Sequence, residues 1–195
     1  MSDVINIQAK NGVLFTLESE KDADKLHRES LLDLTLGKGR KRKSSEILRR
    51  GRLAAQGLSF VVKNVPGELV GSVRLWHVHC NKGQDGIQNA LLLGPLAVSS
   101  KCSGMGIGSI LMRHAIDVAK KLGYGAIFLV GDFEFYQRFG FSNSLTKDLA
   151  MPGPYEKHRF QALELIPKYL TACHGILAPS GELEEWSSFQ NHKVA

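Results

Sequence analysis

The sequence has 195 residues, of which 43% are hydrophobic, and a formal net charge of +6. These values are typical of one soluble globular domain that buries roughly 70% of its unfolded surface. No apolar run approaches the ~18 residues of a membrane span, and the first residues lack the basic and apolar regions of a secretory signal, so we expect a cytoplasmic protein without membrane contact. Cys80, Cys102 and Cys173 form no Cys-x-x-Cys pair, which favours reduced thiols and no metal site.

Hydrophobic periodicity predicts the elements of the first half of the chain. In chain order we expect a polar N-terminal tail, a strand at 15–19, a helix from Ser19 or Asp22 to about Leu34, a short helix from Ser44 to near Gly51 or Gly57, and strands at 58–63 and 69–78 joined by a turn at 64–67. The apolar positions of the longer helix are Ala23, Leu26, Leu31 and Leu34.

The positive charge is concentrated in one segment, residues 38–52, which holds eight lysines and arginines and a single acid, Glu46. Two interpretations stay open: a solvated loop and helix, or a surface that captures an anionic substrate or cofactor. Nucleic acid is an unlikely partner, because the segment has no interleaved aromatic residues and matches no groove-reading motif.

The most informative stretch follows a predicted strand at 90–98. Glycines stand at 104, 106 and 108, and an amphipathic helix is expected over 106–122. Such a loop presents unobstructed backbone N–H groups at the positive end of a helix dipole, which suits phosphate. A P-loop is excluded because no Lys-Ser/Thr pair closes it. A dinucleotide fingerprint is excluded because its third glycine would fall at Ser109 or Leu111.

A second motif follows after one helix and one strand. Behind a buried strand at 126–130, Asp132 is a suitable helix N-cap, and residues 133–141 read Phe-Glu-Phe-Tyr-Gln-Arg-Phe-Gly-Phe. The two motifs resemble those of the GNAT acyltransferase superfamily, namely Gln/Arg-x-x-Gly-x-Gly/Ala after a Leu-Ala-Val strand and Tyr-x-Lys/Arg-x-Gly-Phe. Together with residues 94–98, they look like the YhbS-like bacterial branch. Ser103 stands where the family usually has a long polar residue.

The resemblance covers residues 15–167 of a single N-acetyltransferase domain over 1–195, in which 168–195 is a less certain C-terminal extension. It implies an α/β fold with a central mixed sheet, splayed at the acyl-CoA site, and helices on both faces. Pro95 agrees with the splay because it removes a ladder donor from its strand. Short strands at 145–150 and 160–166 complete the expected elements.

The resemblance also implies an N-acetyltransferase that moves an acetyl group from acetyl-CoA to a primary amine by direct attack. Carried over by position, backbone groups of Leu96, Ala97 and Val98 pair with the pantetheine arm, and the Leu96 N–H polarises the thioester. Tyr136 matches the family's candidate general acid. The residues expected at the diphosphate are Ser103, Gly104, Met105, Gly106, Ile107, Gly108 and Ser109.

Several points stay open at the level of sequence. His77 and His79 share a strand face and either could be a base, but a metal site would lack a third ligand. Many family members deprotonate the amine through water. A non-catalytic acyl-CoA-binding regulatory module on the same fold is the alternative function. The acceptor is undetermined between a small molecule and a protein, and a homodimer, common in the family, is possible.

Overall fold

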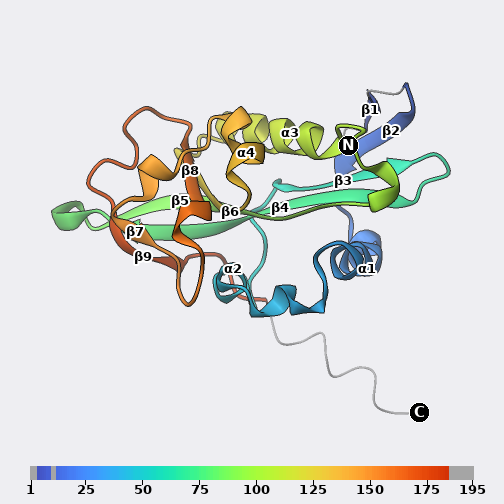
Figure 1. The fold of residues 1–195 in the computed structure, drawn as a ribbon. Coiled ribbons are helices and arrows are strands. Elements are labelled where there is room, and N and C mark those ends of the chain that lie inside the picture. The colour runs from blue at the N-terminus through green and yellow to red at the C-terminus, as the bar shows by residue number, and fades with distance from the viewer. Residues whose placement is uncertain (1–3, 10–11, 185–195) are drawn as a thin grey trace, which may run out of the picture.

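The computed structural model describes residues 4–9 and 12–184, which form one mixed sheet with helices on both faces (Figure 1). The strands are β1 (Ile5–Gln8), β2 (Leu14–Ser19), β3 (Ser59–Asn64), β4 (Leu69–Asn81), β5 (Ile87–Val98), β6 (Ala126–Val130), β7 (Leu149–Ala150), β8 (Phe160–Glu164) and β9 (His174–Pro179). The α-helices are α1 (Lys25–Leu36), α2 (Ser44–Ile47), α3 (Ile107–Lys121) and α4 (Phe133–Tyr136). None of the helices in these described ranges is long and apolar enough to cross a membrane.

The sheet opens where β5 leaves β6. The strand order is β1-β2-β3-β4-β5-β6-β8, and β5 pairs in parallel with β6 only at Leu91 and Leu92. Further along β5 the ladder to β4 shifts register, so that Arg74 alone stands opposite both Gly94 and Pro95. Beyond this bulge, the last residues of β5 have β4 on one side and no β6 partner on the other. The mixed, splayed sheet predicted from the sequence is confirmed.

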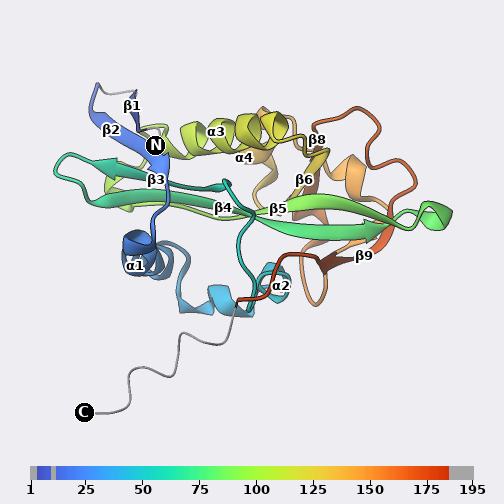
Figure 2. The same ribbon diagram turned by 180° about the vertical axis from the view of Figure 1, so that it is seen from behind.

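Helices α3 and α4 cover one face of the sheet, and α1 and α2 lie on the other (Figures 1 and 2). Helix α3 contacts β3, β4 and β5. Its buried residues recur at the three- and four-residue spacing of one helical face, which is why this segment folds as an amphipathic helix. They are Ile107, Leu111, Met112, Ala115 and Ala119.

The residues that α1 buries differ in part from the apolar positions predicted for this helix. Leu26 and Leu34 are 82% and 87% exposed, whereas Arg28 and Leu32 are buried. Arg28 lies in the interior because it forms ion pairs with Glu20 and Glu29. Of the predicted apolar positions, Leu31 is buried as expected, whereas Leu26 and Leu34 are not. The inner face also holds Arg28, whose charge needs the partner Glu20 from outside the helix.

Both ends of the described chain hold strands that the sequence analysis missed. The polar N-terminal tail contains β1, which pairs antiparallel with β2. In the C-terminal extension, β9 pairs antiparallel with β4 and parallel with β7, and it buries Leu177. The described part of the extension thus belongs to the sheet, while 185–195 lies outside the described residues. The strand expected at 145–150 is shorter, because a 3-10 helix occupies Asn143–Thr146.

Gly71 allows β4 to approach α3 closely. A β-carbon at this position would lie 2.9 Å from Ile107 Cγ2 and 3.1 Å from Leu111 Cδ1. We expect Gly71→Ala to lower the free energy of unfolding by about 1–3 kcal/mol, because the helix must shift to relieve overpacking. Urea denaturation measures this loss. Gly39→Ala is the control, since no atom lies within 4 Å of its added β-carbon; an equal loss in both variants would contradict the packing argument.

Candidate functional site

A groove of about 390 Å³ lies between the free end of β5 and the N-terminus of α3. It begins where β5 has lost its β6 partner, so backbone that would otherwise be covered by a neighbouring strand faces the groove. The lining residues come from the end of β5, the loop before α3, α1 and the α4 region: Leu96, Ala97, Val98, Ser99, Ser100, Cys102, Ser103, Gly104, Gly106, Ile107, Gly108, Ser109, Thr35, Phe135 and Arg138.

The loop before α3 keeps several amides available for a ligand. Gly104 and Gly106 have φ of +75° and +85°, and Gly106 is the N-cap of α3. Within the described residues, the N–H groups of Gly104, Gly106, Ile107, Gly108 and Ser109 donate to no acceptor in the protein. Such donors at a helix N-terminus favour a phosphate group.

Two of the predicted contact residues use their amides inside the turn. The N–H of Ser103 donates to the Ser100 carbonyl at 3.1 Å, and that of Met105 donates to the Cys102 carbonyl at 3.3 Å. Ser103 still lines the groove, whereas Met105 lies on the other side of the loop with Lys101. The free donors are therefore concentrated at the glycines and the first turn of α3.

Arg138 supplies a cation at this groove that the sequence analysis did not assign to the site. Its guanidinium lies 4.7 Å from the centre of the Phe135 ring, and its Nε donates to the Phe135 carbonyl at 3.2 Å. Lys101, the other cation close to this loop, does not line the groove. The sequence could have indicated Arg138, because it lies two residues after Tyr136 and both residues therefore belong to the turn that ends α4.

Tyr136 is partly buried beside the end of β6. Its ring packs so closely on Gly131 that a β-carbon there would lie 2.1 Å from the ring, and Phe135 contacts it edge-on with ring centres 4.9 Å apart. Burial raises the pKa of Tyr136 to about 12, so its hydroxyl is protonated at neutral pH. Within the described residues, the hydroxyl has no hydrogen-bond partner in the protein, and the ring does not line the groove. The phenol is thus a proton donor with no internal acceptor.

Asp132 has a structural role. Its Oδ1 accepts a hydrogen bond from the Phe135 N–H at 3.3 Å, which caps α4. The prediction that Asp132 is a helix cap is confirmed. By starting α4 directly after β6, this cap places Phe135, Tyr136 and Arg138 in one short turn near the splay.

The basic segment is less solvated than its composition suggests. Arg40 is buried and pairs with Glu29 and, at 2.8 Å, with Asp33. Arg49 is also buried and lies 2.9 Å from Glu46. Arg40 thus ties the basic segment to α1, and Arg49 pairs locally with Glu46, so this segment is not a purely solvated loop.

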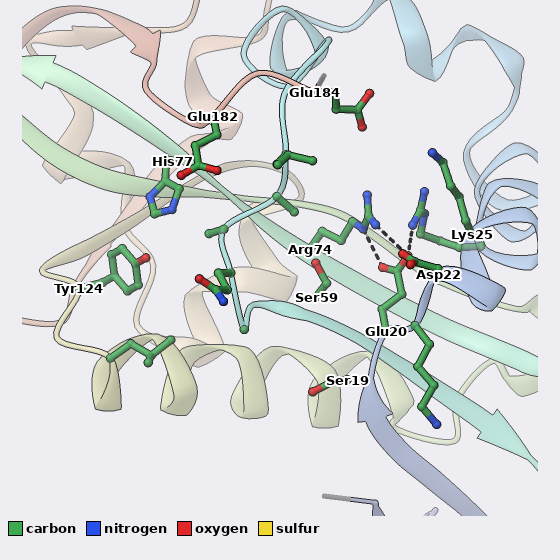
Figure 3. Close-up of a pocket in the computed structure, with 18 of the residues that line it drawn as sticks. Ser19, Glu20, Asp22, Lys25, Ser59, Arg74, His77, Tyr124, Glu182 and Glu184 are labelled. Atoms are coloured by element: carbon green, nitrogen blue, oxygen red, sulfur yellow. Dashed lines mark hydrogen bonds and ion pairs between the residues drawn. The ribbon is translucent and has the colours of Figure 1, made fainter. Parts of the chain in front are cut away.

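A separate cavity of about 1330 Å³ lies beside the middle of β4, in the gap between β3 and β9 (Figure 3). At one end Glu20 forms ion pairs with Arg28 and, at 2.7 Å, with Arg74. At the other end His77 lies against Tyr124, with ring centres 5.7 Å apart. The cavity shares no lining residue with the groove. Across the described part of the chain, no three His, Cys, Asp or Glu side chains are grouped to hold a metal ion.

The family model described as "Acetyltransferase (GNAT) family" matches residues 24–141. The chain is 29% identical over 120 residues to the uncharacterized N-acetyltransferase YhbS of Escherichia coli (strain K12), covering 62% of this chain and 70% of that protein. It is 34% identical over 87 residues to the uncharacterized N-acetyltransferase YjhQ of the same organism, covering 41% of this chain and 48% of that one.

Solved structures agree with these similarities. A crystal structure of the Escherichia coli GNAT family N-acetyltransferase YhbS in complex with CoA matches with a TM-score of 0.72 and 25% identity, covering 86% of this chain and 91% of that one. A GNAT family acetyltransferase from Brucella melitensis in complex with acetyl-CoA matches with a TM-score of 0.57 and 21% identity, covering 90% and 97%, and supports the fold.

Proposed function

Because the chain belongs to the GNAT acetyltransferase family, we propose that it transfers an acetyl group from acetyl-CoA to a primary amine by direct attack. The observation that carries this proposal is the row of free amides from Gly104 to Ser109 at the N-terminus of α3. These donors suit the diphosphate of acetyl-CoA, and the groove extends from them along β5 toward the splay.

In this proposal the exposed backbone of Leu96, Ala97 and Val98 pairs with the pantetheine arm as an added strand would. Arg138 provides positive charge near the phosphates, and its fixed position over Phe135 limits the conformational entropy lost on binding. The thioester then lies near the bulge at Gly94, where the Leu96 N–H polarises its carbonyl oxygen.

The chemical step needs two reactants held together, removal of two protons from the amine nitrogen and donation of one proton to the leaving group. The acceptor ammonium first loses a proton to water. The neutral amine then attacks the thioester carbon, a C–N bond forms, and the C–S bond breaks. Tyr136 donates its proton to the departing thiolate and is then reprotonated from water, and the second proton of the amine nitrogen leaves to water. The products are the N-acetylated amine and CoA.

Saturating acetyl-CoA is expected to raise the melting temperature of the full chain by about 5–10 °C. A ligand at 100 times its Kd adds about 2.7 kcal/mol to the stability of the native state, and each kcal/mol corresponds to roughly 2–4 °C at this chain length. Differential scanning fluorimetry measures the shift, and thiol release across a panel of amines tests turnover.

S-acetylpantetheine is the matched control because it carries the same thioester without the diphosphate. It should shift the melting temperature much less than acetyl-CoA does. Equal shifts would contradict the assigned role of the amides. A shift with acetyl-CoA but no thiol release with any amine would favour the non-catalytic acyl-CoA-binding module.

A further inference from the structure

Arg49 is a buried cation on the α2 side of the splay. It is 8% exposed, and its Nη1 lies close to Gly94, where an added β-carbon would be 3.6 Å away. Gly94 is the residue at which β5 bulges and parts from β6. Its carbonyl accepts a 2.7 Å hydrogen bond from the Trp76 Nε1–H, which holds the bulge in place. Arg49 therefore borders the point where the proposed reaction occurs.

The hydrogen bonds of Arg49 are incomplete. Its Nε and Nη2 both donate to one oxygen of Glu46, at 3.3 and 2.9 Å, and within the described residues Nη1 has no partner. Nη1 is not completely buried, so it retains access to solvent. The other two buried arginines differ, because Arg28 and Arg40 each pair with two carboxylates.

A buried guanidinium with one unpaired nitrogen can bind a further anion. Burial lowers the pKa of Arg49, which shows that Glu46 alone does not offset its desolvation. A second anion at Nη1 would offset the remaining cost and gain charge-assisted hydrogen bonds. Arg28 and Arg40 each pair with two carboxylates, whereas Arg49 has only Glu46, so one singly charged carboxylate completes the same pairing at Arg49.

We propose that Arg49 determines acceptor specificity by binding a carboxylate group carried by the amine acceptor. This inference rests on the proposed function, because the acceptor must approach the thioester at the bulge. It assigns the acceptor to the class of amino acids and other amines that bear a carboxylate.

The test uses the full chain with saturating acetyl-CoA and pairs of amines that differ only in one group. The pairs are the common L-amino acids with their carboxamides, and β-alanine with β-alaninamide; kcat/KM is measured by thiol release. For an acetylated pair, the wild type should prefer the carboxylate by on the order of 10- to 100-fold, as expected for a charge-assisted hydrogen bond.

Variants of Arg49 separate recognition from packing. Arg49→Met should remove the preference, chiefly through a higher KM for the carboxylate, with little effect on the carboxamide. Arg49→Lys should restore part of it, because the charge returns without the planar fork. Arg50→Met is the matched control, since Arg50 is exposed and its Nη2 contacts only the Lys41 carbonyl. All variants should bind acetyl-CoA with the wild-type Kd.

Two results would overturn the inference while leaving the proposed function intact. One is an Arg49→Met variant that keeps the preference. The other is a wild type that binds acetyl-CoA but acetylates no carboxylated amine or shows no preference for it. Should Arg49→Met fail to fold, the wild-type preference and Arg49→Lys still decide. A chain that does not bind acetyl-CoA contradicts the proposed function itself, and the inference falls with it.

Discussion

Replacing Gly106 by valine is expected to lower the affinity for acetyl-CoA at least about 100-fold. Gly106 has φ of +85°, a left-handed conformation that β-branched residues strongly disfavour. The valine must relax toward negative φ, which rotates the N–H groups of Gly106 and Ile107 away from the groove. Each charge-assisted hydrogen bond contributes roughly 1.5–3 kcal/mol, so losing two corresponds to at least about 100-fold in Kd.

Isothermal titration calorimetry gives the Kd, and circular dichroism establishes that the variant is folded. Gly108→Ala is the matched control in the same loop. Its φ is not positive, and its added β-carbon would meet Phe135 and Val98 at an ordinary 3.6 Å. It should therefore bind acetyl-CoA nearly as the wild type does. Similar losses in both variants would show that side-chain bulk, not backbone conformation, controls binding.

The elements predicted most accurately are those whose local pattern matches their tertiary role. Strand β6 has its predicted bounds, 126–130, because a strand that is almost entirely buried reads as a continuous apolar run. Helix α3 lies within its predicted range because its buried face recurs with helical spacing. In α1, by contrast, Arg28 is buried and Leu26 is exposed, since the ion pair of Arg28 with Glu20, which lies outside the helix, outweighs the local pattern.

In the candidate site, too, features set by local sequence were predicted better than features set by tertiary packing. The conformation of the loop at Gly104 and Gly106 is a local backbone property, so glycine spacing indicates it directly. The positions of Arg138 and Arg49 depend on how α4 and α2 pack against the splay. The hydrogen bond between Trp76 and the Gly94 carbonyl joins two strands, and the sequence of neither strand alone predicts it. Sequence therefore predicts the phosphate loop better than the residues that surround the thioester.

The second large effect concerns Tyr136, the proposed proton donor. Tyr136→Phe is expected to lower kcat on the order of 100-fold, because general acids typically contribute at least this much. The Kd for acetyl-CoA should stay within about twofold, since the hydroxyl acts on the departing thiolate and phenylalanine keeps the ring that packs on Gly131. Single-turnover acetyl transfer measures the chemical step apart from product release. Tyr124→Phe is the control, because its ring lies beside His77 in the separate cavity.

The pH dependence distinguishes this role from simple packing. A general acid is active while protonated, and a raised pKa moves its loss of activity to higher pH. Because burial raises the pKa of Tyr136 to about 12, the wild-type rate should not fall on its account between pH 7 and about 10. An alkaline loss within that range that disappears in Tyr136→Phe would mean that the hydroxyl titrates at a lower pH than its burial implies, while a rate that rises with pH only in the wild type would mean that the hydroxyl acts as a base. An unchanged kcat would remove Tyr136 from the mechanism, and protonation of the thiolate would then fall to water.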